Sequence, residues 1–390
     1  MDSIAEKGIR DRCYPGCRIL AIKDGKVFLD KSYGNFTYGN SDNVDENTVY
    51  DLASVTKISG TALALMKLHG EGKLDINKTF GDYLSECNGT NTSALRLCEV
   101  MTHQSGLPAW IPFYKSSLTD KGVYKPGYYS ERQSKDYPFR VRDGMFALST
   151  IRDTILYQVM NCKLKGRGKY LYSDLGYYLH QRIIEKATSQ SLDSFLMVKF
   201  YRRMGLQTIG YTPHRRLSKD QIAPTENDQE FRKALLCGDV HDQGAALMGG
   251  VAGHAGLFSN ANDIAVIMQM LLNKGVYGGE RFLDSNTVKL FAWKNYFPSN
   301  RRGLCFEKPD LDRKKEGPVT SEASMESFGH SGFTGTFVWA DPSNQLIYVF
   351  LSNRVHPNAE SNKLAASHIR PKIHKLLYEA IEDLNPPYKD

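Results

Sequence analysis

The pattern of apolar and polar residues near the start of the chain predicts a β-hairpin. After a short polar helix, two strand-like runs at 18–23 and 26–33 flank Asp24 and Gly25. An Asp-Gly pair between two such runs is typical of a two-residue hairpin turn, because both residues adopt positive φ angles at low cost. Two antiparallel strands are therefore expected directly after the helix.

A second hairpin is predicted near the other end of the chain. Residues 336–340 and 346–351 flank the turn sequence D-P-S-N at 341–344, and a helical pattern follows from about 361 to 381. Strands at both ends and a helix-rich centre are typical of one antiparallel sheet that is built from both ends of the chain.

We therefore expect an α+β fold, in which an antiparallel sheet from both chain ends is flanked by helices and an inserted lobe is mostly helical. Residues 1–80 and 240–390 would form the sheet lobe, and residues 81–239 would form the inserted lobe. A functional site would then lie in the cleft between the two lobes.

The centre of the chain is its least regular part. Residues 115–137 are rich in Tyr, Ser, Lys, Gly and Pro and predict a long loop. Such loops often serve as lids or binding loops, although an ordinary surface loop without a function explains the pattern equally well. Helical patterns at 144–158 and 176–188 bracket the tripeptide Y-S-D at 172–174.

An apolar stripe at helical spacing begins at position 55. Its members are Val55, Ile58, Ala62, Leu65 and Leu68. The stripe predicts an amphipathic helix that packs into a core, while its first turn faces outward.

Ser54 and Lys57 stand at the start of this helix. A spacing of three residues places them one above the other on the same face, within reach of proton transfer. The free N–H groups of a first helical turn also favour negative charge, which suits a hydroxyl that becomes an alkoxide. A serine at this place can equally be an ordinary N-cap, so the pair needs support from other residues.

Composition excludes several classes of protein. The chain has 390 residues, 41% of them hydrophobic and 24% charged, which is typical of a globular protein with a large core. The net charge of +7 is not gathered in a run of Lys or Arg, so no nucleic-acid partner is expected. Arg-Arg pairs at 202–203, 215–216 and 301–302 are expected on solvated faces or at helix ends.

Neither a membrane span nor a signal peptide is expected in the chain. Residues 1–10 lack an apolar stretch, and the longest apolar runs, such as 265–272, are too short to cross a bilayer. The protein would then be cytoplasmic, or a targeting segment or an upstream domain has been removed. Seven cysteines form no C-x-x-C motif and leave at least one thiol unpaired, so they do not fix the compartment.

Three short motifs occur in order along the chain. They are S-V-T-K at 54–57, Y-S-D at 172–174 and H-S-G at 330–332. Together they resemble the motifs of the serine β-lactamase and penicillin-binding protein superfamily, and most closely those of its class C-like branch. The resemblance covers nearly the whole chain, and residues 240–259 look most like penicillin-binding proteins of the 4B type. It implies a β-lactamase/transpeptidase-like fold.

The resemblance implies a mechanism of acyl transfer through a serine. Ser54 would attack a carbonyl group and form an acyl-enzyme, and Lys57 would take its proton. Lys57 can act as a base only if its pKa is lowered, so the cleft around it must be partly desolvated. Tyr172 would relay protons to the leaving group and activate the deacylating water. The backbone N–H groups of Ser54 and Phe333 would form the oxyanion hole.

Several positions depart from the family pattern. Asp174 stands where many class C members have asparagine. If it is ionised beside Lys57 it would keep the lysine charged, and if it points elsewhere the effect vanishes. His330, Ser331 and Gly332 stand where β-lactamases have K-T-G, and a histidine holds a substrate carboxylate less firmly than a lysine. Asp174 and this tripeptide are expected to bind substrate.

The segment after the last strand also differs from the family. Asn358 matches a family asparagine and is expected to bind substrate, but Ser361 stands where the family has an arginine. Arg354 is a candidate to replace that arginine. A second interpretation of the middle motif remains open, because residues 173–175 also resemble the S-D-N of class A enzymes with the asparagine replaced.

The resemblance favours a serine acyl hydrolase that acts on D-Ala-D-Ala-type peptidoglycan amides, on β-lactams or on both. The alternatives are a promiscuous esterase of the same fold and a non-catalytic sensor that binds penicillin or muropeptides. No cofactor and no metal are expected, and a monomer with a small-molecule or peptide substrate is the simplest expectation. The chemistry of the family implies a periplasmic or other extracytoplasmic location.

Overall fold

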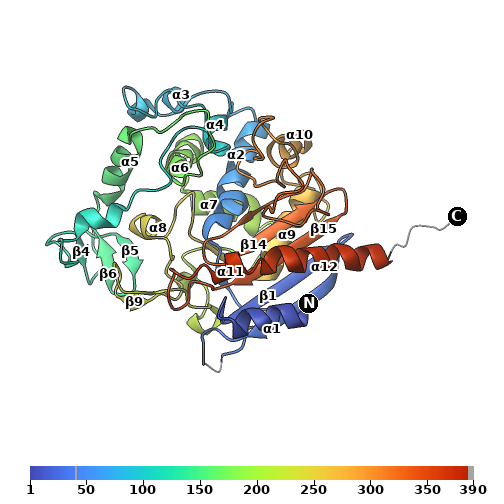
Figure 1. Ribbon diagram of the computed structural model, residues 1–390. Coiled ribbons are helices and arrows are strands. Elements are labelled where there is room, and N and C mark those ends of the chain that lie inside the picture. The colour runs from blue at the N-terminus through green and yellow to red at the C-terminus, as the bar shows by residue number, and fades with distance from the viewer. Residues whose placement is uncertain (40–41, 385–390) are drawn as a thin grey trace.

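A five-stranded antiparallel sheet, built from both ends of the chain, organises the fold (Figure 1). The computed structural model describes residues 1–39 and 42–384. Along the sheet the order is β13-β14-β15-β1-β2. The strands are β1 (Gly16–Lys23), β2 (Lys26–Gly34), β13 (Phe328–Ser331), β14 (Phe337–Asp341) and β15 (Leu346–Ser352). The predicted union of the two chain ends in one sheet is confirmed.

Both predicted hairpins are present in this sheet. Lys23 pairs with Lys26 across the Asp24-Gly25 turn, and Asp341 pairs with Leu346 across the second turn. β1 lies at the centre because it pairs with β15 on one side and β2 on the other. Local turn chemistry therefore fixes each hairpin, and the pairing of β1 with β15 joins the two ends.

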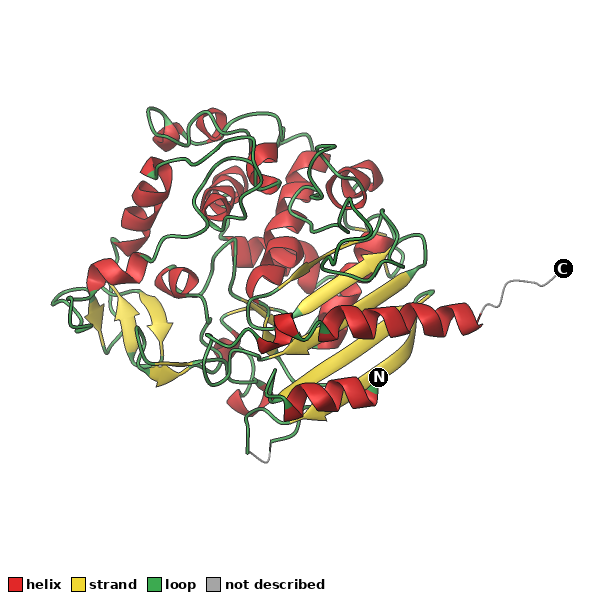
Figure 2. Ribbon diagram, viewed as in Figure 1, coloured by secondary structure: helices red, strands yellow, loops and turns green. Residues whose placement is uncertain are grey.

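Helices cover both faces of the sheet (Figure 2). α1 (Asp2–Arg10) and α12 (Ile369–Leu384) lie side by side on one face. The buried face of α12 packs its apolar side chains against aromatic residues of β14 and β15, among them Trp339 and Phe350. α9 (Ala261–Leu272) packs against β1, β14 and β15 and belongs to the core on the opposite side.

The rest of the chain is mostly helical. The other α-helices are α2 (Ala62–Gly70), α3 (Phe80–Tyr83), α4 (Leu97–Met101), α5 (Ile151–Asn161), α6 (Leu175–Thr188), α7 (Leu192–Leu196), α8 (Gln243–Leu247), α10 (Ser285–Val288) and α11 (Lys363–Ala366). Short 3-10 or π-helical turns are η1 (Ala53–Val55), η2 (Lys57–Thr61), η3 (Ser85–Cys87), η4 (Phe113–Ser117), η5 (Met197–Tyr201), η6 (Pro213–Arg215), η7 (Lys219–Gln221) and η8 (Lys289–Trp293).

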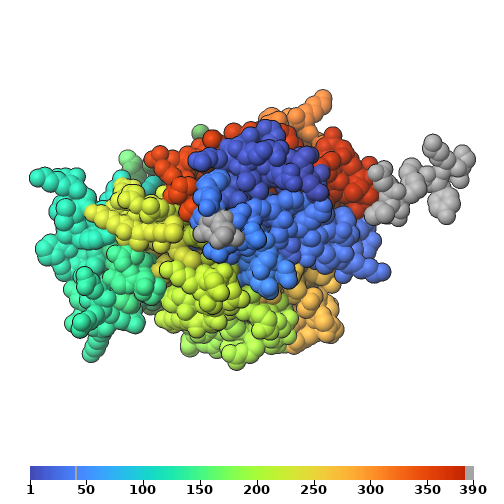
Figure 3. Space-filling model, turned by 90° about the horizontal axis from the view of Figure 1, so that it is seen from below, coloured from blue at the N-terminus to red at the C-terminus, as the bar shows by residue number. Residues whose placement is uncertain are grey.

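In the described part of the chain, four small sheets complete the fold. Their strands are β3 (Tyr50–Asp51), β10 (Leu257–Ser259) and β7 (Gly210–Tyr211); β11 (Val276–Tyr277) and β12 (Glu280–Arg281); β4 (Tyr129–Ser130), β6 (Met145–Ala147) and β5 (Phe139–Arg142); and β8 (Asn227–Asp228) and β9 (Ala234–Leu235). The sheet of β4, β5 and β6 stands at the end of the molecule away from the large sheet (Figure 1). In Figure 3 the teal residues of this region form one end, while N-terminal (blue) and C-terminal (red) residues lie side by side.

Two predictions about helices need correction. The helix expected at 144–158 begins only at Ile151, because Met145 and Ala147 are in a strand that pairs with β4 and β5. The helix that follows Ser54 is not amphipathic. Its residues from 57 to 66 are all buried, because α6, α7 and α10 pack around it.

One hydrophobic core extends through both predicted lobes, from Leu20 in β1 to Leu351 in β15 by way of the central helices. The division of the chain at 80/81 and 239/240 therefore stays a prediction. All seven cysteines are free thiols. Among residues 1–39 and 42–384, no helix combines the length and apolar composition needed to span a membrane.

Candidate active site

The structure brings Ser54, Lys57 and Tyr172 together. Lys57 Nζ donates a hydrogen bond to Ser54 Oγ over 2.7 Å, and Tyr172 Oη donates to the same oxygen over 2.9 Å. Ser54 lies in η1 and Lys57 one turn later in η2, whereas Tyr172 precedes α6. Two proton-bearing groups from distant parts of the chain thus converge on one hydroxyl.

The turn that carries Ser54 is held by the loop after β13. Thr334 Oγ1 donates a hydrogen bond to the Asp51 carbonyl over 2.6 Å, and Thr336 Oγ1 donates to the Leu52 carbonyl over 3.0 Å. A Cβ on Gly332 would collide with Thr336 Oγ1 and the Leu52 carbonyl, so only glycine fits there. The H-S-G motif therefore contacts the residues directly before Ser54.

Lys57 is fully buried beside a carboxylate. Its Nζ lies 2.6 Å from Asp174 Oδ1, in an ion pair whose atoms are not aligned as a hydrogen bond. It also donates to the His254 carbonyl over 3.2 Å and lies about 5 Å from the ring centres of Tyr172 and Tyr177. These contacts surround the ammonium with negative charge and aromatic faces.

The pKa of Lys57 differs from the expectation. Burial on its own would lower the pKa of Lys57, but the negative charge of Asp174 beside the ammonium raises it above the ordinary value. This is the opposite of the lowered pKa that was expected of Lys57 as a base. Of the two alternatives for Asp174, the structure shows the one in which its carboxylate lies beside the amine.

Ser173 points away from the hydroxyl of Ser54. Its Oγ donates a hydrogen bond to the Pro108 carbonyl over 2.6 Å and accepts one from the Leu175 N–H over 3.2 Å. Tyr172, in contrast, contacts Ser54 directly. The geometry therefore favours the class C-like interpretation of this motif over the class A-like one.

We predict that Tyr172→Phe lowers the rate of acylation by about 10²- to 10⁴-fold, because the variant lacks the phenol that is predicted to exchange protons with Ser54. Ser173→Ala is expected to change this rate by less than about tenfold, since Ser173 serves only local backbone groups. Stopped-flow measurement of acylation compares the two variants. The assignment of Tyr172 is wrong if Ser173→Ala abolishes turnover and Tyr172→Phe retains it.

The predicted oxyanion hole has suitable donors. In the part of the chain that the structure describes, neither the Ser54 N–H nor the Phe333 N–H donates a hydrogen bond to another protein group. The Phe333 ring is 54% exposed, stacks on His241 and lies 4.3 Å below the guanidinium of Arg354. The two N–H groups therefore remain predicted donors for a substrate oxyanion.

His330 is buried and neutral. Burial and the nearby charge of Arg302 lower the pKa of His330 to about 3, and its Nε2 lies 3.4 Å from Arg302 Nη1. Because arginine can only donate, Nε2 is the acceptor, and Nδ1–H donates to the Ser331 carbonyl over 2.7 Å. His330 therefore carries no positive charge that could hold a substrate carboxylate.

The side chain of Asn358 forms a local hydrogen bond. It lies in an exposed turn, and its Oδ1 accepts a hydrogen bond from the Glu360 N–H over 2.8 Å. None of its hydrogen bonds reaches Ser54, Lys57 or Tyr172. Its role in substrate binding stays a prediction.

Arg302 is a residue of this region that sequence reasoning missed. The pair at 301–302 was expected on a solvated face, but the side chain of Arg302 is only 3% exposed and donates to Tyr170 Oη over 2.9 Å. The error arises because two adjacent arginines look alike in sequence, while one faces a cavity and the other the core. The apolar run at 303–306 was the only sequence signal of burial at this place.

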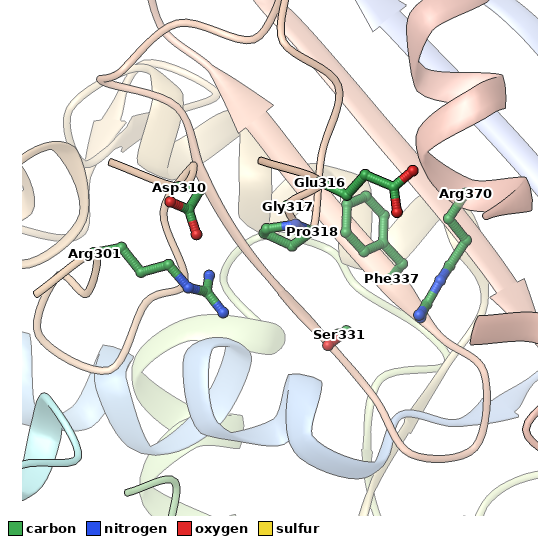
Figure 4. Close-up of a pocket in the computed structure, with 8 residues that line it drawn as sticks. All are labelled: Arg301, Asp310, Glu316, Gly317, Pro318, Ser331, Phe337 and Arg370. Carbon is green, nitrogen blue, oxygen red and sulfur yellow. The ribbon is translucent and has the colours of Figure 1, made fainter. Parts of the chain in front are cut away.

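A cavity of about 300 Å³ opens beside the H-S-G motif. Figure 4 shows the guanidinium groups of Arg301 and Arg370 reaching toward it from opposite sides, with Ser331 between them. Arg301 pairs with Glu307 over 2.7 Å. Among the described residues Arg370 forms no ion pair with a carboxylate, although Asp310 and Glu316 line the same cavity.

Known proteins agree with this architecture. The sequence matches the family model for Beta-lactamase over residues 1–369. A relative from Escherichia coli O157:H7 with the name "Putative D-alanyl-D-alanine carboxypeptidase" is 33% identical in an alignment 387 residues long, which covers 90% of this chain and 82% of the relative.

Solved structures show the same fold at low identity. A class C β-lactamase from Rhodobacter sphaeroides aligns with a TM-score of 0.66 at 17% identity, covering 96% of this chain and 99% of that one. A hydrolase with promiscuous acyltransferase activity aligns with the same TM-score at 14% identity, covering 97% of both chains. With the family match over nearly the whole sequence, these similarities show that the chain belongs to the β-lactamase family, with the fold shared by class C β-lactamases and penicillin-binding protein homologues.

Proposed function

We propose that this protein is a serine acyl hydrolase that forms an acyl-enzyme on Ser54 and acts on D-Ala-D-Ala-type peptidoglycan amides, on β-lactams or on both. The observation that carries the proposal is the convergence of Lys57 Nζ and Tyr172 Oη on Ser54 Oγ, at 2.7 and 2.9 Å. A nucleophile within hydrogen-bond distance of two proton-transfer groups is the arrangement that acyl transfer requires. Such substrates lie outside the cytoplasm, so an extracytoplasmic location is part of the proposal.

In this mechanism the cluster of Ser54, Lys57 and Tyr172 must lose one proton before Ser54 can attack. In the resting state Lys57 and Tyr172 both donate to Ser54 Oγ, so neither is ready to accept its proton. The groups are in contact and titrate together, so the lost proton belongs to the cluster rather than to one residue. The active form is the cluster with one proton fewer.

Ser54 Oγ then forms a bond to the carbonyl carbon. Its proton passes to the Lys57 and Tyr172 pair, which holds one proton fewer in the active form. The Ser54 and Phe333 N–H groups stabilise the oxyanion, a contribution of about 3 kcal/mol for one such donor. Tyr172 hands the proton to the amine nitrogen as the C–N bond breaks, which leaves the acyl ester on Ser54. A peptide substrate then releases its amine, whereas a β-lactam keeps the nitrogen attached to the acyl group. The same groups then activate water to release the acyl group.

The cavity beside Ser331 supports a substrate with a carboxylate next to the scissile bond. D-Ala-D-Ala peptides and β-lactams both carry such a group. Burial lowers the pKa of Arg370, and Arg354 has its pKa lowered to about 10 by burial and by the charge of Arg370. The shift of Arg370 comes from burial, whereas that of Arg354 also includes repulsion by the charge of Arg370, which an anion bound near the two guanidinium groups would relieve.

Arg370→Gln is expected to raise KM for an acyl-D-Ala-D-Ala peptide by about 10- to 100-fold, since hydrogen bonds to charged groups contribute about 1.5–3 kcal/mol. Turnover of a neutral p-nitrophenyl ester should change less than about twofold, because this substrate has no carboxylate. Lys372→Gln is the control, as it removes an exposed positive charge from the same helix. Equal losses with both substrates would show that Arg370 does not recognise a carboxylate.

A promiscuous esterase is the second candidate. It is favoured by His330, which is neutral where β-lactamases carry a charged lysine, and by the exposed ring of Phe333 at the mouth of the site. A non-catalytic sensor is the third candidate, and the raised pKa of Lys57 favours it because a charged lysine is a poor base.

Release of D-alanine from an acyl-D-Ala-D-Ala peptide tests the proposal, with Ser54→Ala as the control. We expect multiple turnovers that stop in the variant. Rapid ester cleavage without D-alanine release would establish the esterase instead. A single acylation without turnover of any substrate would establish the sensor.

A further inference from the structure

Arg302 is a buried cation next to the tyrosine of the proposed site. Its guanidinium carbon lies 5.5 Å from the ring centre of Tyr172, and its Nη2 donates to Tyr170 Oη over 2.9 Å. Nη1 faces His330 Nε2 at 3.4 Å. Its side chain is only 3% exposed, so water screens its charge weakly.

Glu307 is the counter-ion of this arginine. Its Oε1 lies 3.7 Å from Arg302 Nη2 and 2.7 Å from Arg301 Nη2. Burial would raise the pKa of Glu307, but the two guanidinium groups lower it to about 2, so the carboxylate is ionised at neutral pH. Its backbone pairs with Gly329 of β13, which fixes the ion pair to the strand that carries the H-S-G motif.

Few charges act on Tyr172. The rings of His103 and His330 face it at 4.4 and 6.1 Å, and burial lowers the pKa of both histidines far below neutrality. Tyr177 is uncharged, since burial raises its pKa well above the ordinary value. Among the described residues, the charged groups that act on Tyr172 are Lys57 and Asp174, which are paired with each other, and Arg302 with its counter-ion Glu307.

We propose that Arg302 is a positioning residue that makes the loss of the shared proton from the Ser54, Lys57 and Tyr172 cluster easier, and that Glu307 limits this effect. The physical reason is electrostatic: a fixed positive charge near Tyr172 stabilises the deprotonated cluster more than the protonated one. Arg302 cannot lose its own proton, so it acts as a constant field rather than as a base. This inference rests on the proposed function of Ser54.

The test measures how the cluster titrates in variants of the full-length protein. The ¹³Cζ signal of Tyr172, assigned by its absence in Tyr172→Phe, is followed by NMR as a function of pH. The pH dependence of acylation of Ser54 is measured in parallel. The two readouts separate the field of Arg302 from the chemistry of Ser54.

Arg302→Gln and Glu307→Gln are expected to move the titration of the cluster in opposite directions along the pH scale. Arg302→Gln should move the titration of Tyr172 and the rising part of the acylation profile to higher pH by about one pH unit. At pH values below the midpoint of the profile, acylation should then be about tenfold slower. Glu307→Gln removes a negative charge and should move both to lower pH. Arg302→Lys keeps the charge and should stay near the wild type, and Arg182→Gln, at an exposed pair with Glu86, should have no effect.

A merely structural role of Arg302 would lower acylation at every pH and leave the Tyr172 titration in place, and that result would overturn the inference. Movements of the same sign in Arg302→Gln and Glu307→Gln would also overturn it. If Arg302→Gln does not fold, the movement of the Glu307→Gln profile to lower pH decides the question. The NMR titration needs no activity, so it tests the inference even if Ser54 proves not to be acylated.

Discussion

Asp174→Asn is expected to make acylation of Ser54 faster at neutral pH. The carboxylate lies 2.6 Å from Lys57 Nζ, and its charge raises the pKa of this buried amine. An opposite charge at this range changes a pKa by about 1–3, so its removal lets burial lower the pKa of Lys57. The rising part of the acylation profile should therefore move to lower pH. The rate at pH 7 should increase about tenfold for each pH unit by which the profile moves.

Stopped-flow acylation between pH 5 and 10 measures this effect. Asparagine should preserve the local structure, because the side chain of Asp174 makes no capping hydrogen bond to α6. Asp153→Asn is the matched control, since it makes the same change in the first turn of α5, on the surface. An Asp174→Asn variant that is slower at every pH would show that the carboxylate assists the chemistry rather than restraining Lys57.

Lys57→Met is expected to lower acylation by about 10²- to 10⁴-fold, the usual contribution of a positioned proton-transfer group. The variant should also be less stable, because it leaves Asp174 without its cation in a site that is mostly shielded from water. Thermal unfolding and burst kinetics measure the two effects separately.

The double variant Lys57→Met/Asp174→Asn separates stability from chemistry. Without either charge the site has no unpaired ion, so the melting temperature should return toward that of the wild type. Acylation should stay as slow as in Lys57→Met. Recovery of activity together with stability would mean that Lys57 only supports the structure.

Local sequence signals predicted the four hairpin strands of the main sheet, but not its edge strand β13. The turns at Asp24-Gly25 and at 341–344 fix their hairpins through nearby residues alone, and strands at both ends implied a shared sheet. The strand at Met145–Ala147 could not be predicted in this way, because its partners are other short strands in an irregular region. The burial of residues 57–66 likewise depends on three helices that follow them at large sequence distances.

The site shows the same contrast between local and distant contacts. Ser54 and Lys57 meet because helical spacing brings positions three apart together, which sequence reveals. The orientation of Asp174 could not be predicted, because it depends on how a segment 117 residues away packs against the lysine. The burial of Arg302 was missed for a similar reason, since its partner Tyr170 is 132 residues distant.

Intact-mass spectrometry tests the central claim most directly. The wild type and Ser54→Ala are incubated with a penicillin and with an acyl-D-Ala-D-Ala peptide, and the adducts are located by peptide mapping. The account predicts one covalent acyl group on Ser54 of the wild type and none on the variant. An adduct of equal yield on Ser54→Ala would contradict it.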